Sequence, residues 1–198
     1  MAQATGDRKI VRVRPYSNQW RRASASISLS RMKAVPLFFV VVAGMAAHAG
    51  ARGLVVYAGG AWAAIDRGET CEALSRSQKV MPKDKVQPLA GFTFTPDHRR
   101  WGEFHARLSE APRGNASVML TIGDQPFLLV SRGGWAWSQG PLQAQAIIAA
   151  SRGAAMMRVE SRDGSGRRFT DPYLLDGAPT AIDAAAARCA LRGAGKIQ

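Results

Sequence analysis

The chain has 198 residues, of which 46% are hydrophobic and 21% are charged, and its formal net charge is +13. This length and composition allow one compact domain with a hydrophobic core, and they exclude wholesale disorder. Two cysteines are too few for a disulfide-dense miniprotein or a structural zinc cluster.

Residues 1–31 are polar, rich in Ser and Arg, and without hydrophobic periodicity. We interpret them as a basic leader that is either disordered or not translated, with translation then starting at Met32. Residues 1–49 contain eight basic residues and one acid, so more than half of the net positive charge belongs to this part. In the rest of the chain the arginines are scattered, which predicts a solvated cationic surface and no nucleic-acid binding.

Residues 32–49 have the three parts of a secretory signal peptide. Lys33 precedes an apolar stretch over 34–47, and Ala47-His48-Ala49 supplies the small-x-small cleavage pattern. We expect cleavage between Ala49 and Gly50, which predicts a periplasmic or secreted protein that meets the membrane only transiently. The alternative is an uncleaved inner-membrane anchor, since the uncharged run over 34–51 reaches the lower length limit of a membrane span.

The mature chain reads as a linker over 50–60, a single β-rich domain over 61–192 and a tail over 193–198. Alternating apolar residues and turn residues predict strands at 61–65, 70–77, 91–95, 103–108, 117–122, 127–130, 135–137, 156–161 and 167–173. Helices are predicted over 141–151 and 179–191, each beginning at a proline. This pattern is typical of a mainly β fold: an antiparallel sandwich or barrel-like domain with two helices in its C-terminal half.

Export would place Cys71 and Cys189 in a compartment where disulfide bonds persist. Cys189 lies on the apolar stripe of the last predicted helix, with Ile182 and Ala186, so it faces the sheet. A Cys71–Cys189 bond is therefore reasonable, although the two thiols buried apart remain an alternative. The sequence has no C-x-x-C, so it lacks the motif of a thioredoxin-like redox site.

Candidate chemical groups are few, and none is arranged in a known catalytic or cofactor motif. His98 and His105 lack metal-binding spacing, so we predict surface histidines and no metal or cofactor. Asp163, Asp171 and Asp176 are predicted at turns or strand ends, where Asp supports local hydrogen bonds and does not form a catalytic pair.

Trp135-Ala136-Trp137 places two indoles on one face of a short predicted strand. This pair has two interpretations. It is either an interaction face that stacks on a sugar or a partner peptide, or an aromatic pair that packs against the helix after Pro141.

The last 80 residues carry a further pattern. A strand-turn-strand over 118–130 is followed by a helix that ends in Gly over 144–153, a hairpin over 156–173, and Leu175-Asp176-Gly177-Ala178 opening a final helix. This pattern resembles the invasion-associated locus B family of alphaproteobacterial secreted proteins, and Trp62 followed by Cys71 fits the opening strands of that family. Many members carry additional cysteines, whereas this central segment carries Trp135 and Trp137. The resemblance implies a secreted protein and supplies no catalytic residues.

Together these observations predict an exported, non-catalytic envelope or interaction protein without a cofactor. Its expected partner is an envelope protein or a surface polymer. Two alternatives stay open: a periplasmic hydrolase of unrecognised type, and a periplasmic domain anchored in the inner membrane.

Overall fold

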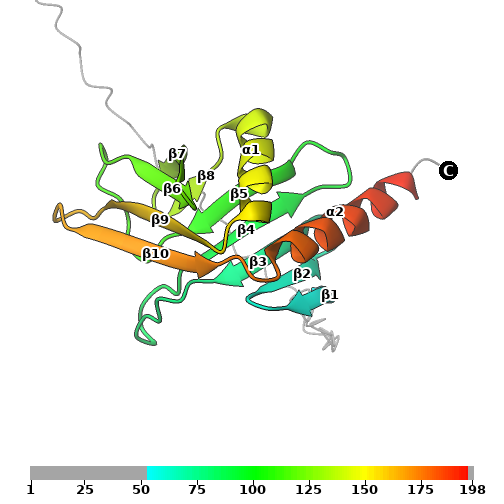
Figure 1. The fold of residues 1–198 in the computed structure, drawn as a ribbon, viewed down its shortest axis with the longest axis horizontal. Helices are drawn as coiled ribbons and strands as arrows, with labels where there is room; N and C mark the ends of the chain where they lie inside the picture. Colours follow the sequence, from blue (N-terminus) through cyan, green and yellow to red (C-terminus); the bar gives the residue numbers. More distant parts are fainter. Residues whose placement is uncertain (1–52, 196–198) are drawn as a thin grey trace, which may run out of the picture. The chain divides into compact units, whose positions relative to one another are not determined.

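The computed structural model describes residues 53–195, which fold into ten β-strands and two α-helices (Figure 1). The strands are β1 (Leu54–Gly59), β2 (Trp62–Asp66), β3 (Cys71–Arg76), β4 (Leu89–Phe94), β5 (Trp101–Arg107), β6 (Val118–Ile122), β7 (Gln125–Arg132), β8 (Trp135–Trp137), β9 (Met156–Arg162) and β10 (Arg168–Leu174). The helices are α1 (Gly140–Gly153) and α2 (Ala178–Ala194). The prediction of a mainly β chain with both helices in its C-terminal half is confirmed.

The ten strands form one antiparallel sheet in the order β1-β2-β3-β4-β5-β8-β7-β6-β9-β10. Most neighbours in the sheet are also neighbours in sequence, since hairpin turns join them. The short strand β8 lies between β5 and β7 and pairs with both. The sheet ends at β1 and β10 and stays open, so it does not close into a barrel.

One face of the sheet, here called the inner face, carries the hydrophobic core. Strands β2 and β3 alternate between buried and partly buried residues, as expected when one face of a strand packs against apolar neighbours. Trp62, Phe92 and Phe104 lie in the core on this face. The ring centroids of Trp62 and Phe92 are 5.9 Å apart, and those of Phe92 and Phe104 are 5.5 Å apart. Aromatic side chains of this size supply much of the apolar area that a small domain buries.

Both helices pack on the inner face (Figure 1). Ile148 of α1 and Ile182 of α2 line the same recess as Phe94 and Trp101. Phe94 lies directly opposite Cys71 in the sheet, so both side chains point to the same face. Cys71 is bonded to Cys189 of α2, so this is the face that α2 covers. The opposite, outer face of the sheet carries neither of the two helices.

The edge strand β10 is tied to the opposite end of the sheet without joining its ladder. The carbonyl of Pro172 accepts hydrogen bonds from the backbone N–H of Gln78 and the hydroxyl of Ser77, both at 2.9 Å. The indole N–H of Trp62 donates to the carbonyl of Leu174 at 2.8 Å. Proline at this position also removes a donor from the exposed edge, a common protection against edge-to-edge pairing.

The start of α2 depends on Gly177, which has a φ of +83° and precedes the first helical residue. A Cβ atom at this position would overlap the carbonyl oxygen of Gly59, the last residue of β1. Glycine therefore satisfies both the left-handed backbone and the close approach of two chain segments. This contact explains the Leu-x-Gly element that precedes the helix in the sequence.

Two predictions about element positions need correction. The segment predicted as a linker contains β1, whose apolar run of Leu54, Val55 and Val56 does not alternate with polar residues. Helix α2 extends to Ala194, inside the predicted tail. The predicted leader, the signal peptide and the Ala49–Gly50 cleavage point lie outside the described residues.

Candidate functional site

Trp135 and Trp137 lie together on the outer face of the sheet. Strand β8 places Ala136, which is fully buried, on the inner face, so both indoles point the other way. Their ring centroids are 6.4 Å apart and the ring planes differ by 17°, a stacked arrangement. The exposed fraction of Trp135 is 37%, whereas Trp137 is half-buried. The indoles therefore do not pack against α1, which lies on the inner face.

His105 lies beneath this aromatic pair. It is directly opposite Trp137 in the ladder, and its ring centroid is 6.2 Å from that of Trp135. Its Nδ1 is 3.1 Å from the hydroxyl of Thr93. Only 8% of His105 is exposed, so the prediction of a surface histidine is wrong here, because the neighbouring indoles cover the ring. Burial lowers the pKa of His105, although Glu72 opposes this shift, and the ring is held neutral at pH 7.

Apolar side chains extend the aromatic pair along β7. Leu128 and Val130 point outward with exposed fractions of 47% and 49%. Val130 lies directly opposite Trp137 and is its neighbour on the same face. Exposed apolar groups that are contiguous with an aromatic pair are characteristic of a binding surface.

The ladder also brings together five residues that the sequence analysis did not connect. Arg132 pairs with Trp135, Trp135 with Arg107, Arg107 with Leu89, and Leu89 with Arg76. Directly opposed residues point to the same face, so these five form one line across the outer face, here called the arginine row. The row spans five strands and 57 residues of sequence. Only the strand order and register reveal it.

A shallow recess of about 680 Å³ adjoins the end of the arginine row. Outward-pointing side chains of β2 to β4 contribute to its lining, among them Ala63, Ile65 and Leu74. Leu89 and Arg76 belong both to the recess and to the row. The outer face thus joins a mostly apolar hollow, a line of alternating cationic and apolar groups, and an exposed indole.

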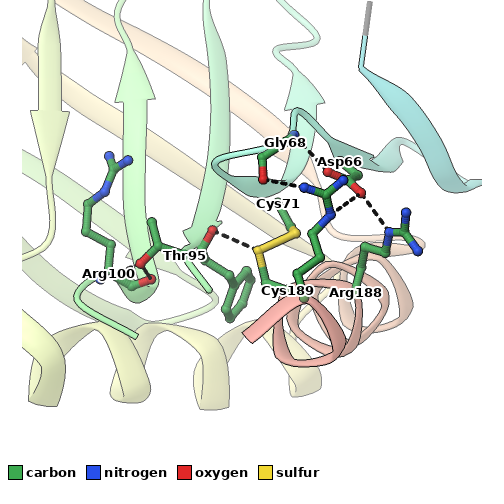
Figure 2. The surroundings of a disulfide bond; sticks show 9 residues. Asp66, Gly68, Cys71, Thr95, Arg100, Arg188 and Cys189 are labelled. Carbon is green, nitrogen blue, oxygen red and sulfur yellow. Dashed lines mark hydrogen bonds and ion pairs between the residues drawn. A yellow bond between two sulfur atoms is a disulfide. The ribbon is translucent and has the colours of Figure 1, made fainter. Parts of the chain in front are cut away.

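The predicted disulfide is present. Figure 2 shows the bond from Cys71 at the start of β3 to Cys189 on α2, where the Cα atoms are 5.7 Å apart. Both cysteines are fully buried, and Sγ of Cys189 also lies 3.2 Å from the carbonyl oxygen of Phe94. The bond closes a sequence separation of 118 residues and holds the last helix on the inner face.

A buried carboxylate supports the same attachment (Figure 2). Asp66 is 4% exposed, and it accepts hydrogen bonds from the Nε–H of Arg188 at 2.7 Å and from the backbone N–H of Gly68 at 2.8 Å. Nε of Arg192 is 3.0 Å away from the same carboxylate. Burial opposes ionisation of Asp66, but the Gly68 N–H and the two guanidinium groups outweigh it and lower its pKa.

Asp171 is the one predicted turn or strand-end carboxylate that the structure places elsewhere. It lies within β10 and is fully buried, because the inner face of that strand turns into the core. Its Oδ2 accepts from the backbone N–H of Ser109 at 2.9 Å, and Nζ of Lys79 is 3.9 Å from its Oδ1. Burial raises the pKa of Asp171 in spite of these two partners. Full burial keeps this carboxyl away from solvent and substrates.

The remaining predicted groups take structural positions. Asp163 accepts from the backbone N–H and the hydroxyl of Ser165, at 2.9 and 2.6 Å, in the hairpin turn where it was expected. His98 is exposed, as predicted, and its ring stacks on Trp101 at a centroid distance of 3.9 Å. Within residues 53–195, no group of three or more His, Cys, Asp or Glu side chains is placed to hold a metal ion.

Comparison with known proteins adds no assignment: no family model, no curated protein and no solved structure matches the chain. Neither of the two helices in the described part has the length and apolarity needed to cross a membrane.

Proposed function

We propose that this protein is an exported, non-catalytic binding protein of the periplasm or the extracellular space, and that the outer face of its sheet binds a component of the cell envelope. The proposed partner is an envelope protein or a surface polymer. The resemblance to the invasion-associated locus B family supports this proposal through the order of strands and helices in the last 80 residues. No cofactor is proposed.

One observation carries the proposal: the exposed indole of Trp135 lies on a sheet face to which neither helix contributes. The hydrophobic core lies on the other face and does not include Trp135. Tryptophan and arginine are enriched in binding hot spots, and Trp135 lies between Arg107 and Arg132 in the ladder. The outer face therefore has the character of a surface kept for a partner.

Two features support export. The signal-peptide pattern over 32–49 supplies the route. The Cys71–Cys189 disulfide fits an oxidising compartment, because such bonds are rare in the reducing cytosol. A catalytic role has less support, since Asp171, whose pKa is raised by burial, is fully buried and pairs with a lysine and a backbone amide rather than with a second carboxylate facing a cleft.

Export is tested by the intact mass of the protein from native cells, measured after alkylation with and without prior reduction. We expect a mass that begins at Gly50, with thiols alkylated only after reduction. A mass that retains residues 1–49 with two alkylated thiols before reduction would contradict export.

Binding is tested by sedimentation of the purified oxidised protein with washed native envelopes. We expect the wild type to sediment and Trp135→Ala to remain largely in solution. Leu142→Ala is the matched control, because Leu142 is an 81% exposed apolar residue on α1, away from the outer face. Equal sedimentation of Trp135→Ala and wild type would overturn the assignment of the outer face.

A further inference from the structure

The arginine row has a regular alternation. Arginine, tryptophan, arginine, leucine and arginine occupy consecutive strands β7, β8, β5, β4 and β3. Neighbouring strands are about 4.8 Å apart, so the arginine positions recur at about 9–10 Å along the row. The row crosses the strands at right angles and ends at the outer recess.

The three arginines of the row are available to an external anion. Within the described residues, Arg76, Arg107 and Arg132 make no side-chain hydrogen bond or ion pair, unlike Arg188 and Arg152, which are paired with Asp66 and Asp183. The loop that joins Arg76 to Leu89 adds Lys83 and Lys85 against one acid, Asp84, while Lys79 in the same loop pairs with the buried Asp171. The end of the row beside the recess is therefore locally cationic.

We propose that the arginine row binds a linear carboxylated polysaccharide, with the polymer lying across the strands. This inference rests on the proposed function and names the chemistry of its partner. Each guanidinium pairs with a sugar carboxylate, for which its planar fork of N–H donors is well suited. Trp135 and Leu89 lie between the arginines and pack against the apolar faces of the intervening rings. The apolar recess beyond Arg76 receives a further ring.

A polysaccharide fits this face better than a nucleic acid. Proteins that bind single-stranded nucleic acids combine a continuous cationic groove with aromatic side chains on which successive bases stack. The row offers one indole, that of Trp135, and its other uncharged position is Leu89. The row therefore lacks the succession of aromatic side chains on which a single strand would stack.

A lipid surface also fits less well. Peripheral membrane proteins insert protruding apolar side chains into the bilayer interface. In the row, Arg107 and Leu89 are only half-exposed, and Leu89 lines the outer recess, so a flat bilayer would not reach them.

The test measures binding of the purified oxidised protein to polygalacturonate, with neutral dextran, single-stranded DNA and phosphatidylglycerol vesicles as the other probes. The variant Arg76→Gln/Arg107→Gln/Arg132→Gln removes the row. The control Arg113→Gln/Arg162→Gln/Arg168→Gln removes the same charge from the end of the sheet near β9 and β10. We expect the row variant to weaken binding to polygalacturonate about tenfold or more, and the control to stay within about twofold of wild type.

Several outcomes would overturn the inference. Equal loss in both triple variants would show attraction to net charge alone, and tighter binding to DNA or vesicles would assign the row to another class of partner. If Trp135→Ala still abolishes envelope sedimentation while polygalacturonate does not bind, the carboxylated-polysaccharide inference fails and the proposed function stands. Arg132→Gln alone, at an exposed position, gives the same readout if the triple variant does not fold.

Discussion

The two faces of the sheet differ in how their side chains are used, although the same strands build both. On the inner face, aromatic rings, two helices, a disulfide and the Asp66 carboxylate form one connected structure. On the outer face, an exposed indole and three arginines, which make no side-chain hydrogen bond or ion pair within residues 53–195, follow a line across five strands. Under the proposed function, stability depends on the inner-face residues and recognition on the outer-face residues that alternate with them along the same strands.

The largest expected effect on the inner face comes from the disulfide. Replacing both cysteines, Cys71→Ser/Cys189→Ser, should lower the free energy of unfolding by up to about 4–5 kcal/mol, because the bond closes a long loop in the unfolded chain. The midpoint of chemical denaturation measures this change. Reductant should have the same effect on wild type and none on the double variant. A wild-type midpoint that reductant leaves unchanged would contradict this role.

The next effect concerns the Asp66 carboxylate. Asp66→Asn should lower the free energy of unfolding by about 1–3 kcal/mol at pH 7, since a buried acceptor for two arginines is lost. Because the native pKa of Asp66 is lowered, its contribution is present above its ordinary value of 3.8 and is lost as pH falls through the native pKa. Thermal melts from pH 7 to pH 2 test this. Asp183→Asn, which breaks an exposed pair with Arg152, is the control and should change stability little.

Asp171→Asn should act in the opposite direction. Burial raises the native pKa of Asp171, so its contribution to stability is fully present below the ordinary pKa of 3.8 and is lost as pH rises through the native value. An uncharged amide avoids that loss, and its oxygen still accepts from the Ser109 N–H. We expect the variant to be about 1 kcal/mol more stable than wild type at pH 7, with no advantage near pH 3. A less stable variant at pH 7 would show that the ionised form is needed.

His105 gives the smallest expected effect and probes the outer face. Its native pKa is lowered by burial, so its contribution is present above the ordinary value of 6.5 and is lost as pH falls. The melting temperature of wild type should therefore fall slightly more between pH 7.5 and pH 5 than that of His105→Gln. Parallel pH profiles for the two proteins would show that Trp135 and Trp137 do not shield the ring.

Local sequence signals were sufficient for most strands and both helices. The alternation at 118–122 and the prolines at the helix starts depend on residues close together in the chain, and the structure follows them. Strand β1 was missed because its apolar run follows a cleavage pattern and lacks polar alternation. The disulfide was predictable because the helical stripe placed Cys189 toward the sheet.

On the outer face, the tryptophan pair could be predicted from the sequence, whereas the arginine row could not. Trp135 and Trp137 lie two residues apart, so period-2 alternation was enough to place them on one face. The arginine row depends on the register between strands that are far apart in the chain, which no local pattern reports. The burial of Asp171 likewise follows from the inner face of β10 turning into the core.

The separation of the two faces is tested most directly by measuring the melting temperature and envelope sedimentation of Trp135→Ala and Asp66→Asn side by side. Trp135→Ala should lower the melting temperature less than Asp66→Asn does and should lose sedimentation. Asp66→Asn should lower the melting temperature and keep sedimentation at temperatures where it is folded. Loss of stability in Trp135→Ala together with unchanged sedimentation would contradict the account, because the outer indole would then serve the fold and not a partner.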